Sequence, residues 1–326
     1  MAPARARLVR RALHGVLLLD KPVGWTSNDA LQKVKNVLRA EKAGHTGTLD
    51  PLANGLLPLC FGAATKFSQV SLDADKAYRA TLRLGQRTEG GDREGAVIEE
   101  RPVQVDRASV EAACAALTGR IDQLPPMHSA LKHQGKALYE YARAGVTVER
   151  TPRAITIHRI DIVDWHADAP ERLVIDVLCS KGTYIRTLAE DIGERLSCGA
   201  HLAALVRTAS GPLHLNDAVS LDALLAATEA EREAWLRPVD ALLHDWPALQ
   251  LQADDAGRFL TGLRRRVAQP DCAALRVYGP GPDLTGASAF LGSAHITGGE
   301  LIADRLLSPL EVQAQLSVAA PPNTPP

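Results

Sequence analysis

No apolar run in this sequence comes near the roughly 18 residues that a membrane-spanning helix needs. The apolar stretch at 15–19 is far too short. Residues 1–11 are basic, but no long apolar segment and no small-residue cleavage site follow them, so we expect no secretory signal. These absences argue against a membrane protein and a secreted protein, and they predict a cytoplasmic one.

Cysteine is scarce and scattered. The five cysteines are odd in number and include no Cys-x-x-Cys pair, a spacing common in metal sites. His128 and His133 have no cysteine or acidic ligand set around them. The sequence also lacks the Gly-x-x-x-x-Gly-Lys-Ser/Thr string of phosphate-binding loops. We therefore expect no metal and no cofactor, and we interpret the cysteines as reduced, buried thiols: Cys60, Cys114, Cys179, Cys198 and Cys272.

An overall excess of positive charge is also missing, because 37 Lys and Arg oppose 38 Asp and Glu. A protein that binds a polyanion usually has such an excess. Basic residues nevertheless gather in three places: within residues 5–11, between 120 and 159, and at 264–266. Each cluster is equally compatible with a solvated surface of mixed charge. The balance of charge therefore leaves nucleic-acid binding open.

Periodic apolar residues predict both helices and strands before residue 246. Apolar residues at every second position indicate half-buried strands, and spacings of three and four indicate helices. A strand that leads directly into a helix near Tyr184 puts Tyr184 and Arg186 at the end of an element, where side chains can face a cleft. Strands are expected at 16–19, 78–84, 155–163 and 173–178, helices at 108–117, 188–196 and 221–232 and after an N-cap at Ser27 or Asn28, and a glycine-rich loop at 85–95.

The pattern changes near Trp246-Pro247. Short apolar segments at 249–251, 275–278, 289–291 and 295–296 are separated by turns rich in Gly and Pro, which predicts a small β-rich domain. The tail at 319–326 is rich in Ala and Pro and is expected to be disordered.

Residues 43–55 contain three glycines, Pro51 and a single carboxylate, Asp50, between two apolar segments. Glycine permits backbone angles and close approaches that other residues resist. Pro51 fixes its own φ and restricts Asp50 to an extended conformation. An isolated Asp-Pro pair is more often an ordinary turn than a catalytic feature. The whole string, however, holds Asp50 in a shaped loop with no second carboxylate to share its proton.

Four stretches in this order resemble the bacterial TruB family of tRNA pseudouridine synthases, which modify uridine 55 in the T loop. They are GVLLLDKPVG at 15–24, AGHTGTLDPLANG at 43–55, KAYR at 76–79 and CSKGTYIR at 179–186. The resemblance implies an α+β pseudouridine-synthase fold, with a mixed, largely antiparallel central sheet flanked by helices and a small C-terminal PUA-like β-barrel domain. The implied division is a flexible basic arm at 1–12, a catalytic domain at 13–245, a PUA-like RNA-binding domain at 246–318 and the tail at 319–326.

The resemblance also implies the site residues. Asp50 matches the family's nucleophile and Arg186 its ion-pair partner, and a carboxylate suits the reaction because it can both attack and leave. Whether Asp50 attacks C6 of the base or C1′ of the ribose stays open. Tyr78 matches the residue that stacks on the flipped base, with proton abstraction at C5 as a second role; on the pattern alone it would be a core tyrosine. The substrate-binding residues are then His45, which holds the base out, Tyr184 and Leu205, which line the pocket, and Lys21, which supports the site.

Residues 124–153 resemble the segment, here called the thumb, that grips the T stem-loop in this family. Tyr139 and Tyr141 alternate there with basic side chains, a combination that can stack on bases and pair with phosphates. An amphipathic helix packed on the body through Leu138 and Tyr141 is the alternative. The expected partner is the T stem-loop of tRNA, with no membrane, no obligate protein partner and a monomeric state. A protein that binds and refolds the T arm without catalysis is the competing function.

Overall fold

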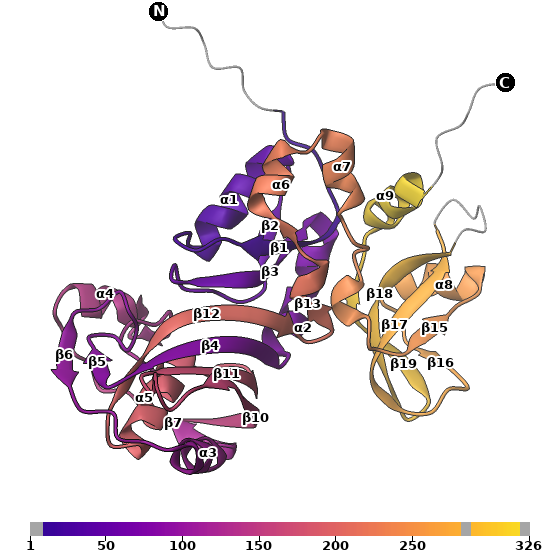
Figure 1. Ribbon diagram of the computed structural model, residues 1–326. Coiled ribbons are helices and arrows are strands. Elements are labelled where there is room, and N and C mark those ends of the chain that lie inside the picture. Colours follow the sequence, from indigo (N-terminus) through magenta and orange to yellow (C-terminus); the bar gives the residue numbers. More distant parts are fainter. Residues whose placement is uncertain (1–8, 282–287, 320–326) are drawn as a thin grey trace, which may run out of the picture.

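The computed structural model describes residues 9–281 and 288–319, which form two sheets with helices around them (Figure 1). In this described part, ten strands form the larger sheet, in the order β14-β1-β3-β12-β4-β11-β10-β7, with β2 beside β3 and β13 beside β12. Two of its pairs, β1–β14 and β3–β12, are parallel, and the others are antiparallel. The α+β class and the mixed, largely antiparallel sheet are therefore confirmed.

The strands of this sheet are β1 (Gly15–Lys21), β2 (Ala43–His45), β3 (Ala53–Phe61), β4 (Lys76–Leu84), β7 (Gly119–Gln123), β10 (Arg153–Trp165), β11 (Arg172–Cys179), β12 (Ala200–Ser210), β13 (Leu213–His214) and β14 (Val219–Ser220). Two small hairpins stand apart from it: β5 (Gln86–Thr88) with β6 (Val97–Glu100), and β8 (Lys132–His133) with β9 (Lys136–Ala137). The second sheet has the order β15-β17-β18-β19-β16, made of β15 (Ala248–Gln250), β16 (Arg265–Arg266), β17 (Cys272–Pro280), β18 (Ser288–Thr297) and β19 (Glu300–Leu306).

The α-helices are α1 (Ser27–Val37), α2 (Ser68–Asp73), α3 (Arg107–Ala115), α4 (Leu138–Arg143), α5 (Ile185–Arg195), α6 (Leu221–Ala226), α7 (Glu229–Ala234), α8 (Ala253–Leu260) and α9 (Pro309–Ala319). Short 3-10 helices lie at Gly62–Phe67, Leu215–Asp217 and Ala241–Leu243. In the described residues, no helix combines the length and apolar character needed to cross a membrane.

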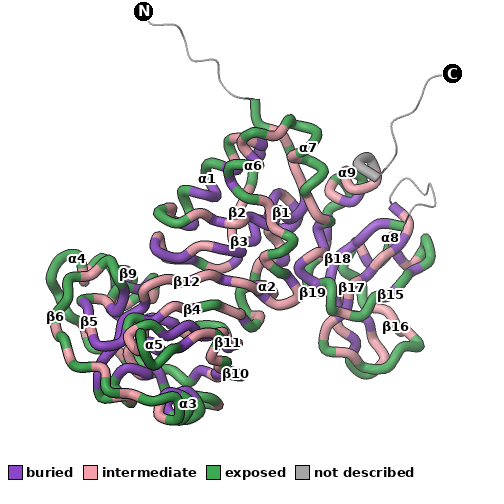
Figure 2. The backbone as a smooth tube through the Cα atoms, viewed as in Figure 1, coloured by how far each residue is buried: buried purple, intermediate pink, exposed green. Residues whose placement is uncertain are grey.

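Strand β1 is apolar on both faces because it separates two cores. Val16 and Leu18 pack into one core, and Leu17 and Leu19 pack with α1 and α6 in another. Figure 2 shows this part of the sheet as largely buried. A third core lies between β4, β10, β11 and β12 and the helices α3 and α5. It fixes the place of α5 against β4 and β12, the elements that carry most of the site.

The second sheet packs against the 3-10 helix at Gly62–Phe67, which directly follows β3. The rings of Phe67 and Phe290 lie 5.2 Å apart, and Lys66 pairs with Glu311 at 2.6 Å. The core on the Val16 side of β1 continues into the second sheet without a break. The small C-terminal β domain predicted from the sequence is present, and it shares a core with the larger sheet.

Several local expectations are corrected. Thr26, rather than Ser27 or Asn28, caps α1, because its side chain accepts the N–H of Asp29 at 3.0 Å. The expected loop at 85–95 contains β5, and the expected helix at 221–232 is two short helices, α6 and α7. The segments at 289–291 and 295–296 belong to a single strand, β18.

The expected flexible arm also ends earlier than residue 12. Residues 1–8 lie outside the described residues. Arg10 donates to the carbonyl of Ala40 at 2.9 Å, and Arg11 pairs with Glu229 at 3.1 Å and also with Glu233. The chain is therefore held to the body by residues 10 and 11. Of the expected disordered tail, residue 319 ends α9, and 320–326 lie outside the described residues.

Candidate active site

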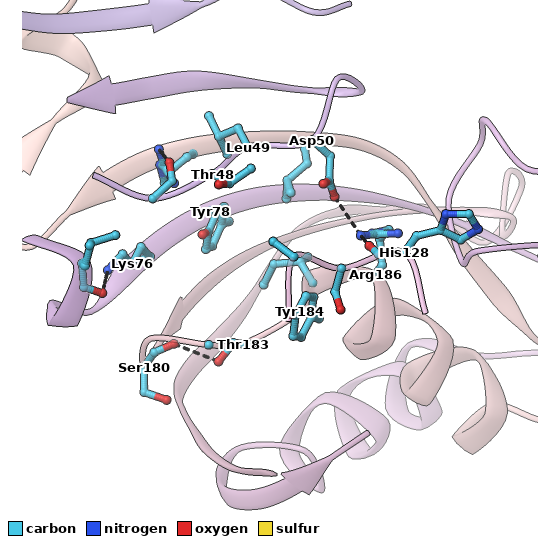
Figure 3. A pocket seen from close by; sticks show the side chains of 18 residues that line it. Thr48, Leu49, Asp50, Lys76, Tyr78, His128, Ser180, Thr183, Tyr184 and Arg186 are labelled. Carbon is cyan, nitrogen blue, oxygen red and sulfur yellow. Dashed lines mark hydrogen bonds and ion pairs between the residues drawn. The ribbon is translucent and has the colours of Figure 1, made fainter. Parts of the chain in front are cut away.

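Four separate segments meet at one cavity of about 300 Å³. Asp50 comes from the loop between β2 and β3, Tyr78 from β4, Tyr184 and Arg186 from the start of α5, and Leu205 from β12. Figure 3 shows Asp50 and Arg186 joined at this cavity, with Tyr78 and Tyr184 beside them. The structure thus brings together five of the seven residues that the sequence points to.

Asp50 and Arg186 form an ion pair in which the two side chains differ sharply in exposure. Arg186 Nη2 lies 3.1 Å from Asp50 Oδ2, and the Arg186 side chain is 7% exposed, whereas that of Asp50 is 43% exposed. Arg186 also donates to the carbonyl of His128 at 2.7 Å and lies 3.6 Å from Asp92. The guanidinium is therefore fixed on several sides, and the carboxylate that it holds remains accessible from the cavity.

The loop that carries Asp50 is attached to the start of α1. The hydroxyl of Ser27 accepts the N–H of Leu49 at 2.8 Å and donates to its carbonyl at 3.1 Å. The main-chain carbonyl of Asp50 accepts the N–H of Ala53 at 3.1 Å, which closes a turn around Pro51. Within the loop the backbone of Gly47 has φ +101°, a conformation that glycine adopts at little cost. Short-range contacts of this kind hold the carboxylate in place before any ligand arrives.

Tyr78 is half-buried and lies directly across from Arg207 in the β4–β12 pairing. Burial raises the pKa of its phenol. The expectation that Tyr78 shares a face with the leucines of β4 is confirmed, since Tyr78 also packs against the core next to α5. Tyr78 therefore lines the cavity and packs against the core from the same position.

Tyr184 and Leu205 line the cavity, as expected. The side-chain amide of Gln123 holds the main chain of Tyr184 on both sides, accepting its N–H at 2.7 Å and donating to its carbonyl at 3.1 Å. Gln123 is 2% exposed and ends β7, just before the thumb. Burial raises the pKa of the Tyr184 phenol. The ring of Tyr184 thus projects from a backbone that two hydrogen bonds with Gln123 hold in place next to the start of the thumb.

His45 and Lys21 lie outside the cavity lining. His45 is half-buried on β2, and burial lowers the pKa of its imidazole. Lys21 is fully buried, and its ammonium donates to the carbonyls of Pro22 at 2.9 Å and Trp25 at 2.6 Å. Burial lowers the pKa of Lys21 to about 8. These hydrogen bonds fit a role for Lys21 as support for the neighbouring turn, away from the cavity wall.

Sequence reasoning missed Arg207, Lys76, Asp92 and Gln123. Arg207 and Lys76 line the cavity, and both are almost completely buried. Lys76 opens the KAYR motif, so the motif itself signalled it. Arg207 could have been found from its spacing of two residues from Leu205, had residues 200–210 been recognised as a strand. Nothing in the local sequence marks Asp92 or Gln123.

The thumb contributes to the cavity and carries exposed basic and aromatic groups. Its residues 128–130 line the cavity. Arg143 of α4 lies over the ring of Tyr139 at 5.2 Å, and Lys136 of β9 lies 4.8 Å from the ring centre of Tyr141. Leu138 is buried, as the alternative of a packed amphipathic helix requires. No group of three or more His, Cys, Asp or Glu that could hold a metal occurs among the described residues.

Comparisons with known proteins identify the family of the chain. The family model described as "TruB family pseudouridylate synthase (N terminal domain)" matches residues 35–185, and that described as "tRNA pseudouridylate synthase B C-terminal domain" matches 186–244. The tRNA pseudouridine synthase B of Cupriavidus pinatubonensis is 57% identical over 308 residues, 92% of this chain and 96% of that protein. The protein of the same name from Verminephrobacter eiseniae is 54% identical over 326 residues, 98% of this chain and 97% of that protein.

Two solved structures share the fold. One is the archaeal box H/ACA sRNP Nop10-Cbf5 complex, with a TM-score of 0.65 and 22% identity over 91% of this chain and 86% of that one. The other is an H/ACA RNP bound to a substrate RNA containing 2′-deoxyuridine, with a TM-score of 0.64 and 21% identity over 90% and 84%. At these identities the likeness shows the fold alone. On the family models and the relatives together, the chain belongs to the TruB family of pseudouridylate synthases.

Proposed function

We propose that this enzyme converts uridine 55 in the T loop of tRNA to pseudouridine, with Asp50 as the nucleophile. The observation that carries the proposal is the pairing of an accessible Asp50 carboxylate with a buried Arg186 guanidinium in a cavity that also holds Tyr78. The names of the relatives, tRNA pseudouridine synthase B, supply the substrate class.

The reaction breaks a glycosidic bond, turns the base and joins it to the same ribose through carbon, with no net gain of water, protons or electrons. A carboxylate can add to the nucleotide and leave again, which is what such a sequence requires. Arg186 keeps Asp50 at one place on the cavity wall through the ion pair between their side chains. Attack at C6 of the base and attack at C1′ of the ribose both start from this carboxylate.

The target base has to leave the stack of the T loop to reach Asp50, at a cost of a few kcal/mol. Stacking on an aromatic ring contributes about 1–3 kcal/mol, which is of the same order. We assign the stacking role to Tyr78, with proton abstraction at C5 as its second role. Tyr184 and Leu205 would complete the pocket wall. His45 lies outside the cavity, so it would contact the opened loop rather than the flipped base.

The division into functional units follows from the same proposal. Residues 13–245 would form the catalytic domain, the thumb at 124–153 would grip the T stem-loop, and 246–318 would form a PUA-like RNA-binding domain. The paired aromatic and basic side chains of the thumb suit a stem-loop ligand. We further propose a monomeric enzyme that acts in the cytoplasm.

A T-arm hairpin tests this function directly. Pseudouridine would be mapped chemically after incubation with the parent protein, with Asp50→Asn, and with Asp176→Asn as a matched control. Asp176 pairs with Arg79 on the other face of the sheet, so its loss should leave turnover unchanged. Asp50→Asn should still bind the hairpin but form no product, because an amide is a far weaker nucleophile. Product from the Asp50→Asn protein would refute the assignment.

The competing function, binding and refolding of the T arm without catalysis, makes a different prediction for the same assay. It predicts binding by every variant and pseudouridine from none, including the parent. The buried guanidinium beside an accessible carboxylate favours catalysis, because a protein that only binds a polyanion gains nothing from a carboxylate in its binding cavity.

A further inference from the structure

Arg207 is a buried cation whose hydrogen bonds go to neutral groups. It is 1% exposed, and its guanidinium donates to the carbonyls of Leu56 at 2.7 Å and Gly47 at 3.3 Å. Neither of these partners carries a charge, although a buried charge is costly unless it is compensated. A guanidinium does not lose its proton under these conditions. The cost of burying this positive charge therefore indicates that the charge has a function at this position.

The strand register puts Arg207 beside Tyr78. The two residues are direct cross-strand neighbours on β12 and β4, and both line the cavity. The guanidinium interacts with the Tyr78 hydroxyl, to which it can donate a hydrogen bond. On the next pair along the same face, Leu205 lies opposite Ala80. Arg207 is thus the charged group that the sheet itself holds against the phenol.

The same guanidinium connects Tyr78 to the loop that carries Asp50. Its two carbonyl partners, Gly47 and Leu56, stand on either side of that loop. Glycine leaves the room that this arrangement needs: a Cβ on Gly47 would lie 3.3 Å from Arg207 Nη1, and a Cβ on Gly55 would lie 2.5 Å from the Arg207 carbonyl oxygen. The Arg207 side chain therefore contacts the Asp50 loop while its residue lies opposite Tyr78.

We propose that Arg207 is a positioning residue for Tyr78, which donates to the phenolic oxygen, directs the phenol's own proton into the cavity and stabilises the phenolate. The inference rests on the proposed function in one respect, which is that Tyr78 exchanges a proton during the reaction. A phenol that accepts from Arg207 has its hydroxyl hydrogen free for a ligand in the cavity. After that hydrogen leaves, the guanidinium faces the new negative charge.

Other groups near Tyr78 act against the phenolate. Burial raises the pKa of Tyr78 most, and Cys179 from β11 and Asp50 from the loop raise it further. Burial raises the pKa of Cys179 itself to about 12. Arg207 is the neighbour that lowers the pKa of Tyr78. Removing the positive charge while keeping the packing should therefore leave the phenol harder to ionise.

The test measures the ionisation of Tyr78 without any RNA. The five tyrosines are replaced by 3-fluorotyrosine, whose phenol ionises at lower pH, and each protein is titrated by fluorine NMR. The Tyr78→Phe protein identifies the resonance of Tyr78. The variants are Arg207→Gln, which removes the charge, Arg207→Lys, which keeps it, and Arg79→Gln as a matched control. Arg79 neighbours Tyr78 on β4 but pairs with Asp176 on the other face.

Arg207→Gln should raise the pKa of Tyr78 by about one pH unit or more. Arg207→Lys and Arg79→Gln should leave it close to the parent value. A merely structural role for Arg207 predicts the opposite sign, because a loosened site admits water and lets the phenol's pKa fall toward its ordinary value. An unchanged or lower pKa in Arg207→Gln would overturn the proposal.

If thermal unfolding shows that the Arg207→Gln protein does not fold, the pKa of Tyr78 in the Arg207→Lys protein tests the proposal instead. A Tyr78 pKa near the parent value in that protein supports the role of the charge, and a rise of one or more refutes it. The readout is independent of turnover, so absence of pseudouridine in the hairpin assay would refute the proposed function and leave this measurement interpretable.

Discussion

The two partners of the central ion pair should respond to mutation in opposite ways. Asp50→Asn is expected to abolish turnover and leave the free energy of unfolding almost unchanged. Arg186→Met is expected to abolish turnover and also to destabilise the protein strongly. The reason is the difference in exposure between the two side chains, 43% for Asp50 and 7% for Arg186.

The magnitudes follow from what each substitution leaves behind. An ion pair with an exposed partner contributes about 0–1 kcal/mol, and the amide oxygen in the Asp50→Asn protein could still accept a hydrogen bond from Arg186. Removal of Arg186 leaves Asp92, 13% exposed, without its cation, and the carbonyl of His128 without its donor. Breaking a buried pair in this way costs about 3–5 kcal/mol. The two variants should thus differ by several kcal/mol in stability, although both are expected to lose turnover.

Urea unfolding followed by circular dichroism would measure the stabilities, and the hairpin assay would measure turnover. Arg186→Lys is a useful third protein, because it keeps the charge but cannot reproduce the set of directed donors. It should fall between the parent and Arg186→Met in stability. Equal stability losses in Asp50→Asn and Arg186→Met would show that the pair acts as one buried unit, and this reasoning would then be refuted.

Three further predictions concern the surroundings of the site. Burial lowers the pKa of Lys21 and of Lys76 from 10.5 to about 8, so between these pH values the unfolded chain holds protons that the folded protein has released. The free energy of unfolding measured in urea should therefore rise with pH across that window, and less so in Lys21→Met; a fall would contradict the assignment. Gly55→Ala should cost about 1–3 kcal/mol, because φ is +98° and the new Cβ would lie 2.5 Å from a main-chain oxygen of β12, whereas Gly44→Ala, with open space around it, should stay within about 0.5 kcal/mol. Phe67→Ala should cost about 3–5 kcal/mol and should make the second sheet unfold separately in calorimetry, and a single unshifted transition would argue against the shared core.

Removal of the C-terminal residues is therefore not a clean test of RNA affinity. On the sequence alone, a protein lacking residues 247–326 would report what the second domain adds to binding. The structure shows that this deletion also uncovers Phe67 and other side chains of the shared core. Substitution of exposed residues at the edge of the second domain, such as Arg264 before β16 and Arg266 in β16, would separate affinity from stability.

The sequence predicted those parts of the fold and the site whose signals are local. The strand pattern of β4 placed Tyr78 on the correct face, and the strand-to-helix junction placed Tyr184 and Arg186 at the cavity. The family motifs located Asp50. These features depend on residues a few positions apart, so they can be read from periodicity and turn chemistry.

The rest depends on pairing between distant segments. The approach of Asp92 to Arg186 and of Arg207 to Tyr78 follows from sheet order, which no local pattern states. The short elements α6, α7 and β5 carry too few residues for a clear period. Lys21 was placed with the substrate-binding residues because it stands in a motif, whereas its burial is a property of the packed structure.

The position of β12 has a consequence for how the protein is made. β12 lies between β3 and β4, which precede it by more than a hundred positions in the sequence. A chain still on the ribosome would expose Asp50 and Tyr78 before the strand that separates β3 from β4 has emerged. Long-range pairing of this kind slows folding, and the waiting edges of β3 and β4 can meanwhile capture the wrong strand. Catalytic competence should therefore appear late, when the sheet closes around β12, and N-terminal fragments should need chaperone protection.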